Sequence, residues 1–414
     1  MRTLTFALLL AGPMLLPAAE TTVSNFKMQE IATDLTVGYA VITADVNADG
    51  KPDIVVVDSK RVVWYENPTW KVRPIITGKT KPDNVCITSL DIDGDGQLDF
   101  VLGADWAPFN TKSGGTLHWL KRGKTLDDEW SIHPIGEEPT VHRVRTIDLD
   151  GKGQRTIVLV PLMGRDSTKE ANWLDGRPVR ILAYPIPKDP FNGPWTPVVL
   201  NEDLHVCHNF FPYATAKGQP ENVLVTAYEG LFNLSKEQDK WKLDKVGAGN
   251  QANLKSNRGA SEVKMGRLAS PSRKGGEFLN YAATVEPWHG NEIVVYPAGP
   301  KGKDGLWQRV VIDDHLRWGH GVWCADLDGD GSEELVIGVR DNPAKGDTFT
   351  EQCGVRIYKP VNGDRTKWDR QIIDNGGVAV EDLTVADLNA DGKPDIIAVG
   401  RKTGNARIYW NQGK

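Results

Sequence analysis

The chain has 414 residues, of which 40% are hydrophobic and 25% are charged. These are ordinary globular proportions, so they exclude a disordered, collagen-like or coiled-coil chain. The formal net charge of −6 gives no support to nucleic-acid binding, and the 42 glycines and 25 prolines favour many strands and turns. The four cysteines have no CxxC spacing, so we expect neither a metal knuckle nor a disulfide framework.

The first 19 residues have the pattern of a secretory signal peptide. Arg2 precedes an apolar run from residue 4 to residue 16, and small residues at 17–19 offer a cleavage site before Glu20. A membrane anchor is the alternative, but the run is short for a bilayer, and no later segment has an apolar run of spanning length. We therefore predict an exported protein, periplasmic or secreted, with no membrane span and with residues 20–414 as its mature domain.

An acidic motif recurs along the rest of the chain. It first reads DVNADGKPD at 45–53 and returns at 91–99, 326–334 and 387–395, with a weakened copy that begins at Asp148. Each copy is followed by an apolar run of strand length and preceded by another short strand-like stretch. Self-similarity of this kind indicates a repeat architecture.

A second, aromatic marker runs in phase with the first. Trp307 lies 19 residues before Asp326, and Trp368 lies 19 residues before Asp387. Further copies of this marker stand at Phe26, Trp70, Trp130, Trp195 and Trp241. Seven markers at intervals of roughly 57 residues, with four strands each, predict an all-β fold, a seven-bladed β-propeller. Because the chain ends one strand short, we expect the N-terminal strand to complete the last blade; several small unrelated β domains are the less favoured alternative.

The acidic motifs have the composition of cation-binding loops. Oxygen ligands recur at motif positions 1, 3, 5 and 9, and Gly at position 6 allows a sharp turn, which suits calcium. A metal-free turn, in which the carboxylates accept backbone N–H groups, is the alternative. We predict structural calcium at four loops, but not at the Asp148 copy, where Lys152 replaces an acid. The expected ligands are Asp45, Asn47, Asp49, Asp53, Asp91, Asp93, Asp95, Asp99, Asp326, Asp328, Asp330, Glu334, Asp387, Asn389, Asp391 and Asp395.

Three histidines share one position in the repeat. His142, His208 and His320 each stand about six residues before the motif Asp or its counterpart, where the innermost strand of a blade begins. A propeller brings such positions together around its axis, on the face opposite the acidic loops. Three neutral imidazoles suit zinc or another transition metal, although hydrogen-bonded channel histidines without a metal are an equal alternative. The loops between second and third strands reach the same face and include Glu229 and His289, and two of them are long, at 161–179 and 341–355.

Part of the chain resembles a known enzyme family. The repeats are similar to FG-GAP or VCBS repeats, and PLMGR (161–165), DLHVCHNFFP (203–212), TVEPWHGNEIVVY (284–296) and DDHLRWGHGVWCADLDGDG (313–331) resemble the propeller domain of aldos-2-ulose dehydratases. The resemblance implies a zinc-containing cleft and elimination of water from a keto-sugar such as 1,5-anhydrofructose. It implies acid–base roles for His205, His289 and Glu229 and an electrostatic clamp at Arg317.

Three classes of function remain open on these grounds. The first is an exported carbon–oxygen lyase that acts on a small carbohydrate. The second is another carbohydrate-active propeller, such as a polysaccharide lyase or a 3-keto-glycoside eliminase. The third is a non-catalytic binding propeller stabilised by calcium. The first two classes require the histidines to converge.

Overall fold

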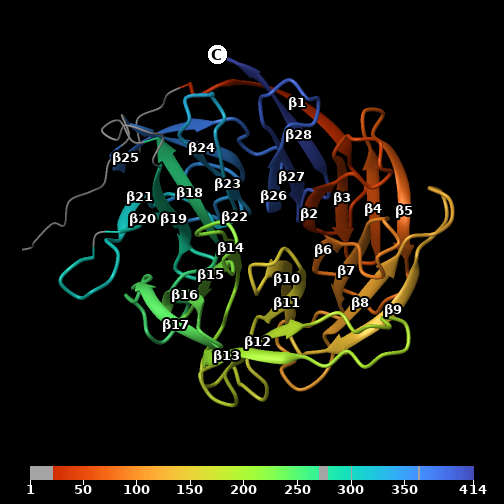
Figure 1. Ribbon diagram of the computed structural model, residues 1–414. Helices are drawn as coiled ribbons and strands as arrows, with labels where there is room; N and C mark the ends of the chain where they lie inside the picture. The colour runs from red at the N-terminus through yellow and green to blue at the C-terminus, as the bar shows by residue number, and fades with distance from the viewer. Residues whose placement is uncertain (1–21, 270–277, 300, 362–363) are drawn as a thin grey trace, which may run out of the picture.

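The computed structural model describes residues 22–269, 278–299, 301–361 and 364–414, so the predicted signal peptide lies outside the described residues. Seven four-stranded antiparallel sheets stand as blades around a central axis, as predicted (Figure 1). Among the described residues, no helix is long and apolar enough to cross a membrane.

Each of the first six blades uses four consecutive strands, ordered from the axis outward. Blades one to three comprise β2 (Gly38–Ala44), β3 (Asp53–Asp58), β4 (Arg61–Glu66), β5 (Lys71–Thr77); β6 (Cys86–Leu90), β7 (Asp99–Ala104), β8 (Thr116–Lys121), β9 (Ser131–Glu137); and β10 (Val141–Asp148), β11 (Arg155–Pro161), β12 (Val179–Tyr184), β13 (Val198–Leu204). Blades four to six comprise β14 (Phe210–Tyr213), β15 (Asn222–Ala227), β16 (Gly230–Glu237), β17 (Lys240–Gly247); β18 (Val263–Ala269), β19 (Phe278–Glu286), β20 (Glu292–Pro297), β21 (Val310–Asp313); and β22 (Gly319–Ala325), β23 (Glu334–Val339), β24 (Gly354–Val361), β25 (Asp364–Ile372).

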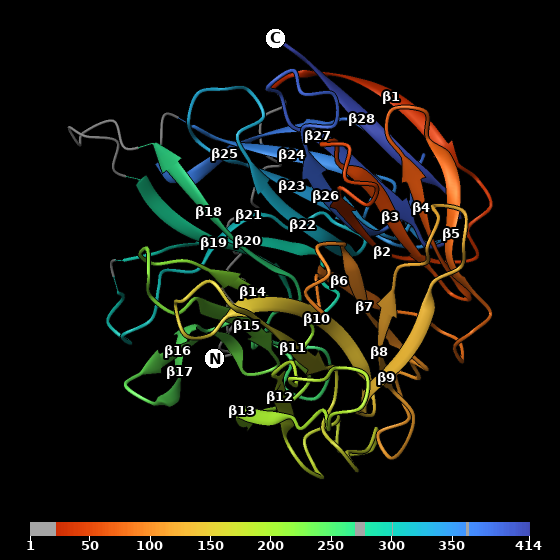
Figure 2. The ribbon, with the colours of Figure 1, turned by 45° about the vertical axis from the view of Figure 1, so that its right-hand side comes forward.

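The seventh blade joins the two ends of the described chain. It contains β26 (Val380–Ala386), β27 (Asp395–Gly400) and β28 (Ala406–Gly413), and its outermost strand is β1 (Asn25–Ala32). β1 pairs antiparallel with β28, with Met28 opposite Tyr409. The predicted closure is therefore confirmed, and Figure 2 shows β1 lying along β28. Closure leaves no unpaired edge between first and last blades.

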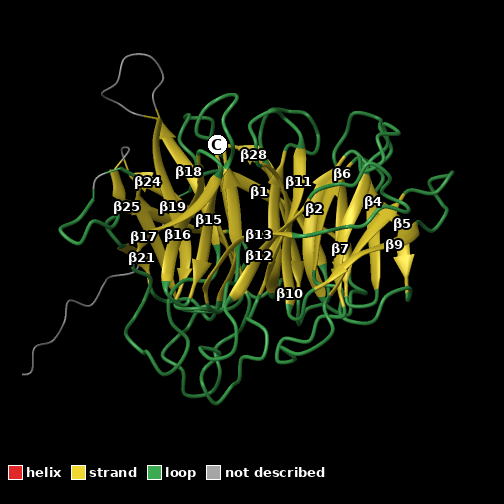
Figure 3. Cartoon of the chain, turned by 60° about the horizontal axis from the view of Figure 1, so that its bottom comes forward, coloured by secondary structure: helices red, strands yellow, loops and turns green. Residues whose placement is uncertain are grey.

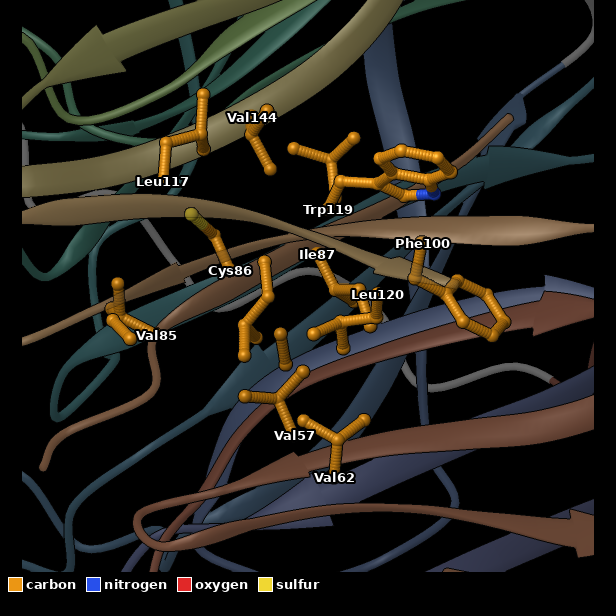
Figure 4. Close-up of a cluster of buried hydrophobic side chains, with 14 of the residues drawn as sticks. Val57, Val62, Val85, Cys86, Ile87, Phe100, Leu117, Trp119, Leu120 and Val144 are labelled. Carbon is orange, nitrogen blue, oxygen red and sulfur yellow. The ribbon is translucent and has the colours of Figure 1, made fainter. Parts of the chain in front are cut away.

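The second strand of each blade carries most of the core. The side chains of β3 and β7 are all buried, because each of these sheets is covered on both faces by its neighbours. Figure 4 shows the packing between the first two blades, where Val57 and Val62 meet Ile87 and Leu120, with Trp119 nearby. Such contacts hold each innermost strand at a fixed position around the axis.

The blades separate two faces that carry loops (Figure 3). The acidic motifs connect first and second strands, as in 45–53 between β2 and β3. The opposite face carries the loops between second and third strands and the connections between blades. The innermost strands begin there, so the predicted histidine positions and these loops lie on one face, which we call the histidine face.

Candidate functional site

In four blades, the second residue of the innermost strand lies in a bulge at the histidine face. In blade six, Gly319 pairs with Val339 and Gly321 with Gly338, so His320 is an extra residue without a partner. The same skip occurs at Tyr39, His142 and Glu381. A bulge re-aims the extra side chain away from the sheet faces, which explains why one register position supplies residues to the axis.

Four imidazoles converge at this level. The ring centroids of His142 and His208 are 4.7 Å apart, those of His208 and His320 5.2 Å, and those of His289 and His320 5.0 Å. The Nε2 atoms of His208 and His289 are separated by 2.7 Å. We call these four residues the histidine cluster. The three register histidines converge at the axis, but His142, predicted as a metal ligand, is not part of the set whose nitrogens all lie within 4.8 Å of one another; His289 takes its place there.

The cluster contains a set of atoms that could bind a metal. Nitrogen atoms of His208, His289 and His320 all lie within 4.8 Å of one another. The Nε2 atoms of His208 and His289 are so close that their lone pairs would repel each other. A shared proton or a cation between the two atoms removes this repulsion. His142 has both ring nitrogens buried without a hydrogen-bond partner. The described residues therefore fit a cation held by imidazole nitrogens.

Acceptors on the outer side of the cluster orient two of its rings. Nδ1 of His208 lies 2.8 Å from Oε1 of Glu262, and Nδ1 of His320 donates to the backbone oxygen of Glu381. A proton on each Nδ1 leaves Nε2 of both rings as a lone pair aimed into the cluster. This arrangement is typical of histidines that bind metals.

Burial keeps the imidazoles neutral. It lowers the pKa of His142, His289 and His320 well below the usual histidine value, and it lowers the pKa of His208 despite the opposing charge of Glu262. A neutral imidazole is the form that binds a metal ion.

Glu262 is the site residue that the sequence patterns missed. It is buried, and it accepts hydrogen bonds from Asn209 Nδ2 and, at 3.4 Å, from Arg143. The amide of Ser261 donates to the carbonyl oxygen of Val285, and Val263 pairs with Thr284. Glu262 therefore lies in a bulge of blade five that is equivalent to the bulges at His142 and His320. Burial alone would raise the pKa of this carboxyl, but the contact with His208 and the Arg143 guanidinium outweigh it and hold the pKa far below its usual range.

His289 reaches the cluster from a tight turn between β19 and β20. Its φ is +51°, and a Cβ at the following Gly290 would lie 2.1 Å from the Glu286 carbonyl, so the turn requires glycine there. The indole of Trp288 stacks on the imidazole of His289 with centroids 4.4 Å apart. His289, predicted as an acid–base residue, thus lies among the candidate metal ligands.

The other predicted catalytic residues lie on surrounding loops. Nδ1 of His205 is 2.9 Å from Oε1 of Glu229, and Nε of Arg317 is 3.1 Å from the Asp347 carboxylate. The backbone amide of Tyr228 donates to the His205 carbonyl, and the Tyr228 ring lies 6.1 Å from Trp288. The rings of Tyr228 and Trp288 therefore lie between the His205–Glu229 pair and the cluster.

The acidic loops share a pattern of backbone contacts. The carboxylate at position 9 is fully buried and accepts the backbone N–H of position 2, for instance Asp53 from Val46 at 2.9 Å. The Asp at position 1 accepts the N–H of position 6, as Asp45 does from Gly50. Backbone N–H groups bound by side-chain carboxylates in this way are the contacts of an Asx turn.

The four predicted calcium loops nevertheless divide into two pairs. Asp53 and Asp395 use their second oxygen to accept another backbone amide, whereas Asp99 Oδ1 and Glu334 Oε1 are buried without a hydrogen-bond partner. The loops that begin at Asp91 and Asp326 each hold three acids whose oxygens lie within 4.8 Å of one another. A lysine from the third strand contacts each of these two loops: Lys121 lies 2.7 Å from Asp95, and Lys359 lies 2.6 Å from Asp330. Calcium at all four loops stays a prediction.

The fold and the site together define a class: a seven-bladed propeller of FG-GAP-like repeats with a buried histidine cluster at the axis. The family model for FG-GAP-like repeats matches residues 45–102 and 326–398. The model for the β-propeller domain of aldos-2-ulose dehydratase matches residues 114–298, which include His142, His205, His208, Glu262 and His289. The resemblance stated from the sequence is confirmed by these matches.

A curated relative agrees with the second match. Aldos-2-ulose dehydratase of Phanerodontia chrysosporium is 27% identical to this chain over 301 residues, which cover 69% of the chain. The chain spans about a third of that relative's length, 32%.

Solved structures with similar folds have unrelated sequences. A chain in the crystal structure of BBS1N in complex with ARL6DN matches with a TM-score of 0.53 at 11% identity and covers 96% of this chain and 98% of its own length. A chain of the Mitotic Checkpoint Complex matches with a TM-score of 0.54 at 9% identity and full coverage of both, 100%. These two likenesses concern the fold alone.

Proposed function

We propose that the protein is a carbohydrate-active lyase that eliminates water from a keto-sugar at the histidine cluster. The observation that carries this proposal is the convergence of four imidazoles at the axis, three of which lie within residues 114–298, the region similar to aldos-2-ulose dehydratase. Trp106, which stacks on His142 at 5.8 Å, and Trp288 offer apolar faces of the kind that sugar rings contact.

The proposed reaction removes a proton from the carbon beside the carbonyl and expels the hydroxyl from the next carbon. His205, which would take the carbon-bound proton, returns it to the departing hydroxyl, so the products are an enone and water. A divalent ion bound by His208, His289 and His320 would supply Lewis-acid polarisation of the carbonyl. Glu229 accepts the Nδ1 proton of His205 and leaves its Nε2 free to take the carbon-bound proton. Arg317, paired with Asp347 on the same face, would stabilise negative charge on the substrate.

Replacement of one cluster histidine tests the proposal. We expect His289→Gln to lose most bound transition metal and activity, because two imidazoles do not complete a zinc site. Activity is read as an ultraviolet-absorbing enone formed from 1,5-anhydrofructose or a 3-keto-glycoside. His133→Gln is the matched control, since His133 lies on β9 and contacts Trp119 away from the cluster. A His289→Gln protein as active as the control, together with wild type that takes up no transition metal, would refute the proposal.

Export through residues 1–19 is part of the same proposal, and it rests on the apolar run and the small residues before Glu20. Amino-terminal sequencing of the protein recovered from its natural host tests it, with Glu20 as the expected first residue.

A further inference from the structure

The central channel contains a second polar site, separate from the histidine cluster. A cavity of about 260 Å³ lies between the innermost strands, and neither His142, His208, His289 nor His320 lines it. Its walls carry the cations Arg143, Arg145 and Lys264, the acids Glu262 and Asp382, and the hydroxyls Thr43, Thr88, Ser89 and Thr384. The proposed function uses none of these cations.

Two of the cations have no acidic partner. Arg145 donates to the backbone oxygen of Phe210 and to the side-chain oxygen of Asn209, both neutral acceptors at 2.8 Å. The buried ammonium of Lys264 lies 3.9 Å from the ring centroid of Trp323 and 4.5 Å from that of Phe211. Within the described part of the chain, no carboxylate lies at ion-pair distance from Lys264.

The two acids do not balance these charges. Glu262 is already engaged by His208, Asn209 and Arg143. Asp382 accepts the backbone amides of Val41 and Leu383, and burial raises its pKa. The cavity is thus left with an excess of positive charge.

Uncompensated buried charge is strongly unfavourable, so a buried cation normally has a counter-ion. Burial and the nearby charge of Arg145 lower the pKa of Lys264 to about 7, and the opposing charges of Asp382 and Glu262 do not offset this shift. The hydroxyls that line the cavity can donate additional hydrogen bonds to an oxyanion. The net charge of the whole chain, −6, does not attract an anion. The attraction would have to come from the cations and hydroxyls that line the cavity.

We propose that the channel cavity is a binding site for a small oxyanion, held by Lys264 and Arg145 and by the surrounding hydroxyls. The ligand class is a compact sulfate-, phosphate- or carboxylate-bearing molecule that fits within the cavity. The cavity and the cluster share Glu262, which lines the cavity and contacts His208, but no cluster histidine lines the cavity, so the two sites are tested by different variants.

Sulfate titration into the mature protein tests the proposal by calorimetry, in a buffer free of other oxyanions. Wild type should bind one sulfate per chain, and Lys264→Met should weaken binding at least about tenfold, since a charged hydrogen bond is lost while the side-chain volume is kept. Lys240→Met, an exposed lysine on β17, is the matched control and should bind as wild type does. His289→Gln should also bind as wild type does.

Three results would overturn the proposal. They are no sulfate binding by wild type, equal binding by Lys264→Met and Lys240→Met, and loss of binding in His289→Gln, which would place the anion at the cluster. If Lys264→Met does not fold, wild-type crystals soaked in sodium selenate decide the question. Selenium located by anomalous scattering among Lys264, Arg145 and Thr43 supports the site, and its absence there refutes it.

Discussion

Glu262 offers a direct test of how the histidine cluster is organised. Its carboxylate lies 2.8 Å from Nδ1 of His208 and also contacts Asn209 and Arg143. Replacement of Glu262 with Gln keeps the size of the side chain but removes its charge. The amide can still accept one hydrogen bond, yet it no longer strengthens the basicity of the His208 ring.

Two effects of different kind follow from this contact pattern. An outer carboxylate that orients a metal-binding histidine contributes about 10- to 100-fold to metal affinity, which corresponds to about 1.4–2.8 kcal/mol. Arg143, which is largely buried beside Glu262, also loses its counter-charge. The loss of one partner of a buried ion pair costs on the order of 3 kcal/mol of folding stability. We therefore expect both weaker metal binding and a lower free energy of unfolding.

The two effects are measured separately. Zinc affinity is obtained by competition with a chromophoric chelator, and stability by urea unfolding of metal-free protein. Glu137→Gln, at the exposed end of β9, is the control that loses an acid without contacting the cluster. If Glu262→Gln binds zinc within about threefold of that control, the carboxylate does not strengthen metal binding by His208.

Three further predictions concern the loops and the core. Calcium at 100 times its dissociation constant should stabilise the protein by about 2.7 kcal/mol per site. Asp328→Ala should therefore lower the melting temperature more in calcium than in chelator. An equal drop in both conditions indicates the metal-free turn. Lys359→Met should raise calcium affinity, measured by calorimetry, because the ammonium beside Asp328 and Asp330 competes for the same oxygens; unchanged affinity contradicts this. Trp119→Ala should destabilise the protein by about 3–5 kcal/mol in urea unfolding, since the indole is fully buried and packs against Phe191 and His133. A loss below about 1 kcal/mol would contradict this packing.

The architecture could be predicted because two independent markers repeat in phase. A propeller blade is one structural unit, so the acidic motif and the Trp marker needed only correct spacing to give strand order, blade number and closure. The position of His320 relative to Asp326 is local in sequence, and ring symmetry then places it near His142 and His208. Local spacing combined with symmetry was sufficient for these three residues.

Glu262 escaped the same reasoning because blade five departs from the repeat. In blades six and seven the register residue follows the marker by 13 positions (307 to 320, 368 to 381), whereas Glu262 follows Trp241 by 21 (241 to 262). An insertion between β17 and β18 shifts the position, and no acidic motif follows to restore the count. If the insertion between β17 and β18 is taken into account, the remaining sequence feature that indicates this position is an acid, Glu262, directly before β18.

His289 illustrates a different limit. It lies in a loop between second and third strands, and no periodic rule states how far such a loop reaches toward the axis. Its contact with His208 depends on the left-handed backbone at His289, on the tight turn at Gly290 and on the stacked indole of Trp288. The sequence placed His289 on the correct face, but only these tertiary constraints bring its Nε2 to 2.7 Å from that of His208. A propeller core fixes which face a residue occupies, and the loops on that face then determine which side chains complete the site.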